Sequence, residues 1–163
     1  MNFTYEKLLN KSLNNEIISE DEIKWILTDK EVELLPLLYT AYKVRYKYFE
    51  NKVKIHVINN VKNGNCSENC SYCVQSKESV NKIEKYPIRE KQEILADAKV
   101  AYENGTYRYC LVFAGSRQND KDMEYICDVV KDIKANYKME VCVSAGFLDE
   151  KKLKTVNDNY FKT

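Results

Sequence analysis

Three cysteines stand close together near the middle of the chain. Cys66, Cys70 and Cys73 form the pattern C-x3-C-x2-C in a polar stretch between residues 63 and 79. Three closely spaced thiolates can bind three irons of a [4Fe–4S] cluster and leave the fourth iron without a protein ligand. An iron with an open coordination position can bind and reduce a second molecule. The spacing therefore indicates a cluster that acts on a bound cosubstrate.

A zinc site is the alternative interpretation of the same three thiols. Structural zinc takes four closed ligands, commonly supplied by pairs of C-x2–4-C type, and this stretch offers three cysteines. His56 is the only histidine of the chain, and a single histidine within an apolar strand is expected to pack rather than to bind a metal. We therefore favour iron over zinc.

The other three cysteines are Cys110, Cys127 and Cys142. An even number of cysteines would suggest disulfides in a secreted protein, but residues 1–11 contain no apolar stretch typical of a signal peptide. We therefore expect a cytoplasmic protein whose cysteines bind metal or take part in catalysis. Cys127 falls on the apolar face of a predicted helix, and we expect it in the core.

Composition narrows the class of protein further. Of the 163 residues, 44% are hydrophobic and 31% are charged, which predicts a folded domain rather than a disordered chain. The 26 Lys and Arg residues nearly balance the 25 Asp and Glu residues. No basic surplus favours nucleic acid, and no apolar run approaches the roughly 18 residues of a membrane span. We expect neither partner.

The elements that must position the cysteines begin with a helical segment over residues 1–50. Ser19 to Glu22 reads S-x-x-E, which predicts a helix N-terminus with a capping box. A second predicted helix runs from Leu34 to Phe49, with Pro36 in its first turn. We expect residues 1–50 to form a helical extension that precedes a domain over residues 51–163.

From residue 53 onward, strand and helix patterns alternate. The predicted strands are Val53–Ile58, Tyr107–Ala114 and Met139–Ala145; the predicted helices are Glu90–Asn104, Asp120–Asn136 and one beginning at Asp149. This alternation predicts an α/β fold with a parallel sheet, either a barrel or a doubly wound sheet. Neither G-x-G-x-x-G nor a P-loop is present, which disfavours the nucleotide-binding versions. About three strand–helix units fit, whereas a (β/α)8 barrel needs about 250 residues, so we expect the front portion of a longer barrel.

The residues around the cysteines resemble a known family. C-x3-C-x2-C with an aromatic residue before the last cysteine is the signature of radical S-adenosylmethionine (radical SAM) enzymes. The wider segment Asn63–Ser76, NGNCSENCSYCVQS, resembles the cluster-binding segment x-G-x-C-[PS]-E-[DN]-C-x-[YF]-C-x-Q-S of biotin synthases. The resemblance spans about residues 45–155. It implies the N-terminal part of a (β/α)8 radical-SAM TIM-type barrel with a helical N-terminal extension.

The resemblance also implies an activity, the sulfur insertion that converts dethiobiotin to biotin. Cys66, Cys70 and Cys73 would bind the [4Fe–4S] cluster, and its open iron would bind S-adenosyl-L-methionine. An electron from a reductant such as flavodoxin or ferredoxin would cleave that cosubstrate to a 5′-deoxyadenosyl radical, which would abstract hydrogen from dethiobiotin. A [2Fe–2S] cluster would supply the sulfur. The full-length family implies a homodimer.

Further site residues follow from the same resemblance. Cys110 and Cys142 would be two of the [2Fe–2S] ligands, with a third cysteine and an arginine on later strands that nothing after Cys142 supplies. Strand alternation places Arg108 on the face of Cys110, and Glu140 on the face of Cys142. The residues expected to contact S-adenosylmethionine or another cofactor are Tyr72, beside the adenine, Phe113, Ala114 and Gly115, through backbone contacts, and Arg108.

Two other interpretations stay open. A sister radical SAM enzyme, such as a hydrogenase-maturation or methylornithine-forming relative, would not need Cys110 and Cys142 together. A non-catalytic gene fragment that binds an iron–sulfur cluster, or nothing, would also fit a chain of this length.

Overall fold

The structure is a computed structural model that describes residues 3–64 and 66–160, with side chains described up to residue 156. The chain divides into two compact units, Met1–Val53 and Lys54–Thr163. Each unit is described by itself below. Within the described part of the chain, no helix combines the length and the apolar character that crossing a membrane requires.

The first unit contains three helices: α1 (Tyr5–Leu13), α2 (Glu20–Thr28) and α3 (Leu34–Phe49). The predicted capping box is present, since the Glu22 N–H donates to Ser19 Oγ at 3.3 Å and the Ser19 N–H donates to the Glu22 carboxylate at 2.8 Å. Lys11 of α1 also donates to Glu22, at 2.9 Å. These bonds begin α2 at the predicted place and fasten it to α1.

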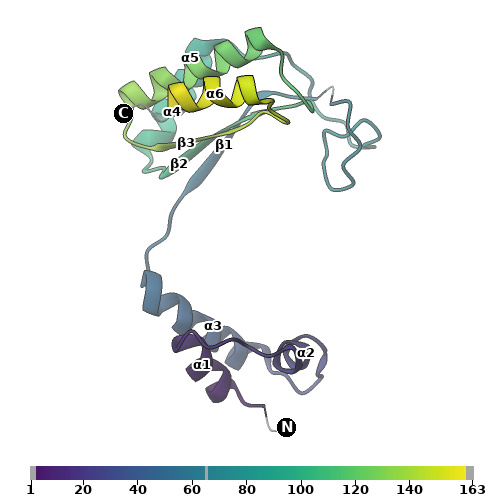
Figure 1. The fold of residues 1–163 in the computed structure, drawn as a ribbon, viewed down its shortest axis with the longest axis vertical. Coiled ribbons are helices and arrows are strands. Elements are labelled where there is room, and N and C mark those ends of the chain that lie inside the picture. The colour runs from purple at the N-terminus through teal and green to yellow at the C-terminus, as the bar shows by residue number, and fades with distance from the viewer. Residues whose placement is uncertain (1–2, 65, 161–163) are drawn as a thin grey trace. The chain divides into compact units, whose positions relative to one another are not determined.

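The second unit alternates strands and helices, as the sequence predicts. Its elements, in chain order, are β1 (His56–Lys62), α4 (Lys91–Glu103), β2 (Arg108–Phe113), α5 (Asp120–Asn136), β3 (Glu140–Ser144) and α6 (Glu150–Tyr160). The strands form a parallel sheet in the order β1-β2-β3. Helices α4, α5 and α6 all lie on one face of this sheet (Figure 1). The predicted parallel α/β fold is confirmed.

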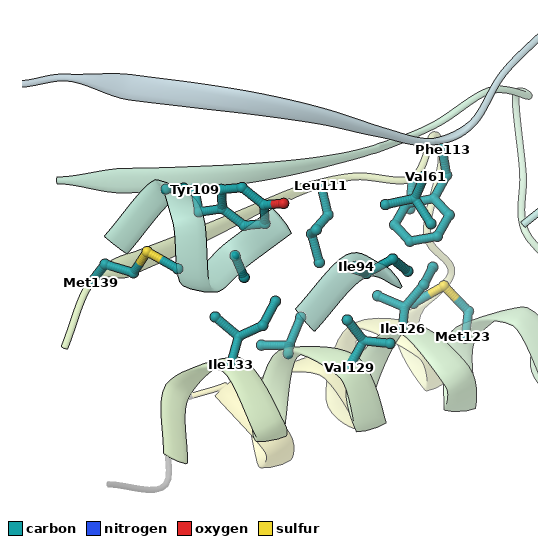
Figure 2. Packing of buried hydrophobic residues seen from close by; sticks show 14 residues of the cluster. Val61, Ile94, Tyr109, Leu111, Phe113, Met123, Ile126, Val129, Ile133 and Met139 are labelled. Carbon is teal, nitrogen blue, oxygen red and sulfur yellow. The ribbon is translucent and has the colours of Figure 1, made fainter. Parts of the chain in front are cut away.

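The core lies between the sheet and these helices. Along β2 the side chains alternate, with Tyr109, Leu111 and Phe113 buried and the residues between them half-buried. The buried side chains of β2 point toward apolar residues of α5, among them Ile126, Val129 and Ile133 (Figure 2). Cys127 is buried on α5, as predicted. The opposite face of β2, which carries Cys110, is not covered by α4, α5 or α6, the described helices of the second unit (Figure 1).

The first strand lies later in the sequence than predicted. The prediction of Val53–Ile58 is wrong in its bounds, because β1 runs from His56 to Lys62 and includes Asn59 and Asn60. Asparagine is disfavoured in strands, but Asn59 is buried and donates to Tyr109 Oη at 2.6 Å and to Asp97 Oδ2 at 3.0 Å. These tertiary contacts outweigh the local preference.

Candidate functional site

The cysteine-bearing loop leaves the sheet at the end of β1. An antiparallel bridge closes its base, since the Asn63 N–H donates to the Tyr86 carbonyl at 3.3 Å and the Tyr86 N–H donates back at 3.1 Å. The loop between these residues extends beyond the ends of the strands (Figure 1). Because all strands are parallel, the loops that follow β2 and β3 begin at this same edge of the sheet.

The three thiols of this loop are free and at least partly open to solvent. Cys66 and Cys73 are half-buried, and Cys70 is exposed. The Cys73 N–H donates to the Cys70 carbonyl at 3.0 Å, which forms a turn between the two cysteines. Among the described residues, no three His, Cys, Asp or Glu side chains converge as a metal-binding group. The donor set, three unpaired thiols on one short segment, nevertheless fits an iron–sulfur cluster better than zinc.

A hydroxyl pair and two backbone hydrogen bonds connect the loops of this edge. Ser67 Oγ, next to Cys66, lies 3.4 Å from Ser116 Oγ in the loop after β2. The Phe147 N–H, in the loop after β3, donates to the Ser116 carbonyl at 2.8 Å, and the Ala114 N–H donates to the Lys62 carbonyl at 2.9 Å. The three loops are therefore linked through the segment that follows β2.

That segment holds three of the residues predicted to contact S-adenosylmethionine. The side chain of Phe113 is 3% exposed and belongs to the core, and Ala114 is also buried. Gly115 has a positive φ of 122°. The side chains of Phe113 and Ala114 are thus unavailable to a ligand, which agrees with the expected role for the backbone; that role stays a prediction. Tyr72 is 90% exposed, and its place beside an adenine is likewise untested.

Arg108 lies at the other end of the strands, at the start of β2. Its guanidinium forms an ion pair with Glu140, the facing residue on β3, with Nε donating at 2.8 Å. Tyr107 Oη donates to the same carboxylate at 2.5 Å. These two donors lower the pKa of Glu140, and the carboxylate raises the pKa of Arg108. A cofactor role for Arg108 stays a prediction.

Cys110 and Cys142 lie directly opposite each other on β2 and β3. Both are half-buried, on the sheet face that α4–α6 leave uncovered. Burial and the neighbouring Cys142 thiol raise the pKa of Cys110 to about 11. Ile58 faces Cys110 from β1 and is 67% exposed. Strand alternation predicted only which neighbours share a face with each cysteine. The structure adds that the two cysteines are direct neighbours across β2 and β3.

His56, for which we expected packing within an apolar strand, is exposed at the start of β1. Its ring stacks on Tyr107, with the ring centroids 5.9 Å apart. The imidazole thus packs, as expected, but at the exposed end of the sheet, because β1 begins at His56 rather than at Val53.

Sequence reasoning did not assign contacts to the polar residues within the cysteine loop. Gln75 Oε1 accepts a hydrogen bond from the Gly64 N–H at 3.0 Å, and Asn69 Nδ2 donates to Glu78 Oε2 at 2.7 Å. Gln75 and Asn69 are part of the segment that resembles biotin synthases, so their presence could be noted from sequence. Their hydrogen-bond partners could not.

Comparison with known proteins identifies the class. The family model described as the radical SAM superfamily matches residues 61–161. This chain belongs to the radical SAM superfamily, as its cysteine spacing predicts.

Its curated relatives specify the resemblance further. The chain is 46% identical over 133 residues to a biotin synthase of Magnetococcus marinus, and the match covers 82% of this chain and 41% of the relative. It is 42% identical over 153 residues to a biotin synthase of Leptospira biflexa, and this match covers 94% of this chain and 43% of the relative. The predicted resemblance to biotin synthases is confirmed. The chain spans less than half the length of these relatives.

Solved structures share the fold. Methylornithine synthase superposes with a TM-score of 0.75 at 20% sequence identity, over 93% of this chain and 44% of the other. The FeFe-hydrogenase maturase of Carboxydothermus hydrogenoformans gives 0.72 at 22% identity, over 95% of this chain and 36% of the other. The second unit therefore has a partial radical SAM fold.

Proposed function

We propose that this chain belongs to a biotin synthase-like radical SAM enzyme that inserts sulfur into dethiobiotin. The observation that carries the proposal is the pairing of Cys110 with Cys142 on the uncovered face of the sheet, in a chain that also bears the three-thiol loop. A sister radical SAM enzyme would need the loop but not the pair. The structural neighbours with other activities share less than 25% identity and support the fold alone.

In this proposal Cys66, Cys70 and Cys73 hold a [4Fe–4S] cluster. When bound, such a cluster supplies the electron that cleaves S-adenosyl-L-methionine and starts the radical chemistry, while the protein supplies placement and exclusion of water. The link from Ser67 to Ser116 at 3.4 Å brings the loop next to the segment after β2. The backbone of Ala114 and Gly115 can then bind the cosubstrate beside the loop, because Phe113 anchors the strand end in the core.

Cys110 and Cys142 hold a [2Fe–2S] cluster in the same proposal, as two of its ligands. Their strands are fixed by the ladder that also pairs Arg108 with Glu140 and Val112 with Ser144. A site on a rigid sheet keeps its geometry better than one on a loop. The 163-residue chain supplies two of the four ligands that the resemblance implies, so turnover to biotin requires ligands that these residues do not provide.

Anaerobic reconstitution with iron and sulfide tests the loop assignment. We expect about four irons per chain at the loop, measured by iron and sulfide analysis with Mössbauer spectra. Replacement of Cys66, Cys70 and Cys73 by Ala should abolish this cluster, whereas the control Cys127→Ala, a buried position on α5, should retain it. Unchanged cluster content in the triple variant would overturn the assignment.

Activity is tested by measuring 5′-deoxyadenosine and biotin side by side under a strong reductant, with S-adenosylmethionine and dethiobiotin present. We expect the 163-residue chain alone to give slow formation of 5′-deoxyadenosine and no biotin. Supplying the later strands of a relative, as a fusion or a separate chain, should restore biotin formation. Biotin made by the chain alone would contradict the required ligand set. A loaded cluster without any 5′-deoxyadenosine would favour a non-catalytic iron–sulfur protein.

A further inference from the structure

We propose that Gln75 and Asn69 are positioning residues for the cluster. Their side chains join the two limbs of the cysteine loop, residues 64–69 and residues 75–78, and so set how tightly iron is retained. This inference rests on the proposed function, because it concerns the cluster assigned to the same loop. Neither side chain is a cluster ligand in the proposal. Each acts by restraining the backbone that carries the thiols.

Gln75 closes a ring around the three cysteines. Its Oε1 accepts from the Gly64 N–H at 3.0 Å, which joins the residue two positions before Cys66 to the residue two positions after Cys73. Gln75 and Cys66 also line the same hollow of about 440 Å³ within the loop. The Gln75 side chain therefore joins the backbone just before the cysteine motif to the backbone just after it.

Asn69 makes the second connection, between the limb that follows Cys66 and the limb that follows Cys73. Its Nδ2 donates to Glu78 Oε2 at 2.7 Å, and its Oδ1 accepts from Ser76 Oγ at 3.0 Å. A backbone bond runs alongside, because the Lys77 N–H donates to the Glu68 carbonyl at 2.9 Å. Together these bonds hold the two limbs next to each other, with the Cys70–Cys73 turn beyond them.

These bonds have little to do with the stability of the fold. None of the residues between Cys66 and Lys82 belongs to the hydrophobic core, and Asn69 and Glu78 are exposed. The three thiols do not converge in the described structure, so cluster binding must order their side chains. Ordering costs less when the backbone on either side is already restrained, which is why the loss of either connection should weaken retention without unfolding the protein.

The experiment compares the reconstituted 163-residue chain with four variants. Gln75→Leu and Asn69→Leu keep approximate size but remove the hydrogen bonds. Gln75→Glu keeps an oxygen acceptor for the Gly64 N–H. Gln92→Leu makes the same change on the exposed surface of α4 and is the matched control. The readouts are the rate of iron loss to a chelator, followed by cluster absorbance, and the hydrogen exchange rate of the Gly64 amide in the metal-free chain.

We expect Gln75→Leu to lose iron about fivefold faster than wild type, the effect of one net hydrogen bond. Asn69→Leu removes two hydrogen bonds, to Glu78 and from Ser76, and should lose iron at least as fast as Gln75→Leu. Gln75→Leu should also raise the exchange rate of the Gly64 amide about fivefold. Gln75→Glu and Gln92→Leu should stay within about twofold of wild type in both measurements, because neither removes the acceptor. Unchanged circular dichroism would verify folding.

The outcomes separate this inference from the proposed function. If wild type binds a cluster and Gln75→Leu retains iron as long as Gln92→Leu does, the positioning role is wrong and the loop assignment stands. If Gln75→Leu leaves Gly64 exchange unchanged, the connection does not restrain the loop and the inference is likewise wrong. If wild type binds no cluster at all, the loop assignment and this inference both fail.

Discussion

Gly146, in the loop after β3, is the glycine at which an added methyl group should destabilise the loop-bearing edge of the sheet most. Its φ is +80°, a conformation that side chains with a Cβ rarely adopt. A Cβ built on Gly146 would lie 2.6 Å from the carbonyl carbon of Ser116 and closer still to its carbonyl oxygen. Both atoms are backbone, so neither can rotate away. We predict that Gly146→Ala pushes the loop after β3 away from the loop after β2.

The expected magnitude has two parts. Placing Ala at a positive φ costs about 1 kcal/mol. Separation of the loops also breaks the hydrogen bond from the Phe147 N–H to the Ser116 carbonyl, 2.8 Å long, which adds about 1 kcal/mol, and the displaced packing adds about as much again. The sum is about 3 kcal/mol. For a unit of this size about 4 °C of Tm corresponds to 1 kcal/mol, so Tm should fall by about 12 °C.

Gly105 provides the matched control. It too has a positive φ, of 76°, at the end of α4, but a Cβ there would have nothing within 4 Å. Gly105→Ala therefore carries the backbone strain without the collision and should lower Tm by only about 4 °C. Thermal and urea unfolding of both variants under reducing conditions, followed by circular dichroism, measures the difference. Equal losses of stability in the two variants would refute the collision with Ser116.

Three further predictions concern single side chains. The pKa of Glu22 is lowered to about 2, chiefly by hydrogen bonding from Lys11, so its contribution to stability is present above pH 4.5 and is lost as pH falls toward 2. The fluorescence of the single tryptophan during acid unfolding should show this loss, and the Glu22→Gln variant should lose less stability over the same pH range. Because the pKa of Cys110 is about 11, the rate at which this thiol is alkylated in the metal-free chain should rise about tenfold per pH unit between pH 8 and 10. Peptide mass spectrometry measures this rate, and a rate that does not change with pH would contradict the raised pKa. Asn59→Ala should destabilise by about 2 kcal/mol in urea unfolding, and Asn60→Ala, at an exposed position, by much less.

The sequence predicted the bounds of a helix well where residues within or next to that helix determine them. Helix α5 has the predicted bounds, Asp120–Asn136, because Asn119 caps its first turn by accepting from the Asp122 N–H. Helix α4 begins and ends within one residue of its prediction. Strand β1 could not be placed as well, because burial of Asn59 against Asp97 depends on a helix that begins more than 30 residues later. No window of local sequence contains that information.

The candidate site divides in the same way. The spacing of Cys66, Cys70 and Cys73 is a local property, and it was enough to predict the superfamily to which the chain belongs. The shared face of Cys110 and its strand neighbours followed from strand alternation. That Cys110 faces Cys142, however, depends on the register of β2 against β3, and the contact between Ser67 and its neighbour after β2 depends on how two loops fold. Both are decided by tertiary packing.

The two sets of cysteines are consequently held by different means. Cys110 and Cys142 each occupy the third position of a strand, and the parallel register brings third positions opposite each other. Ladder hydrogen bonds and a buried core on the other face fix that register, so the pair is as stable as the sheet. The loop thiols depend on side-chain hydrogen bonds such as that of Gln75 to Gly64, each worth about 1 kcal/mol. In the proposed function, bound iron would therefore order the loop thiols, whereas the sheet holds Cys110 and Cys142 opposite each other without a cluster.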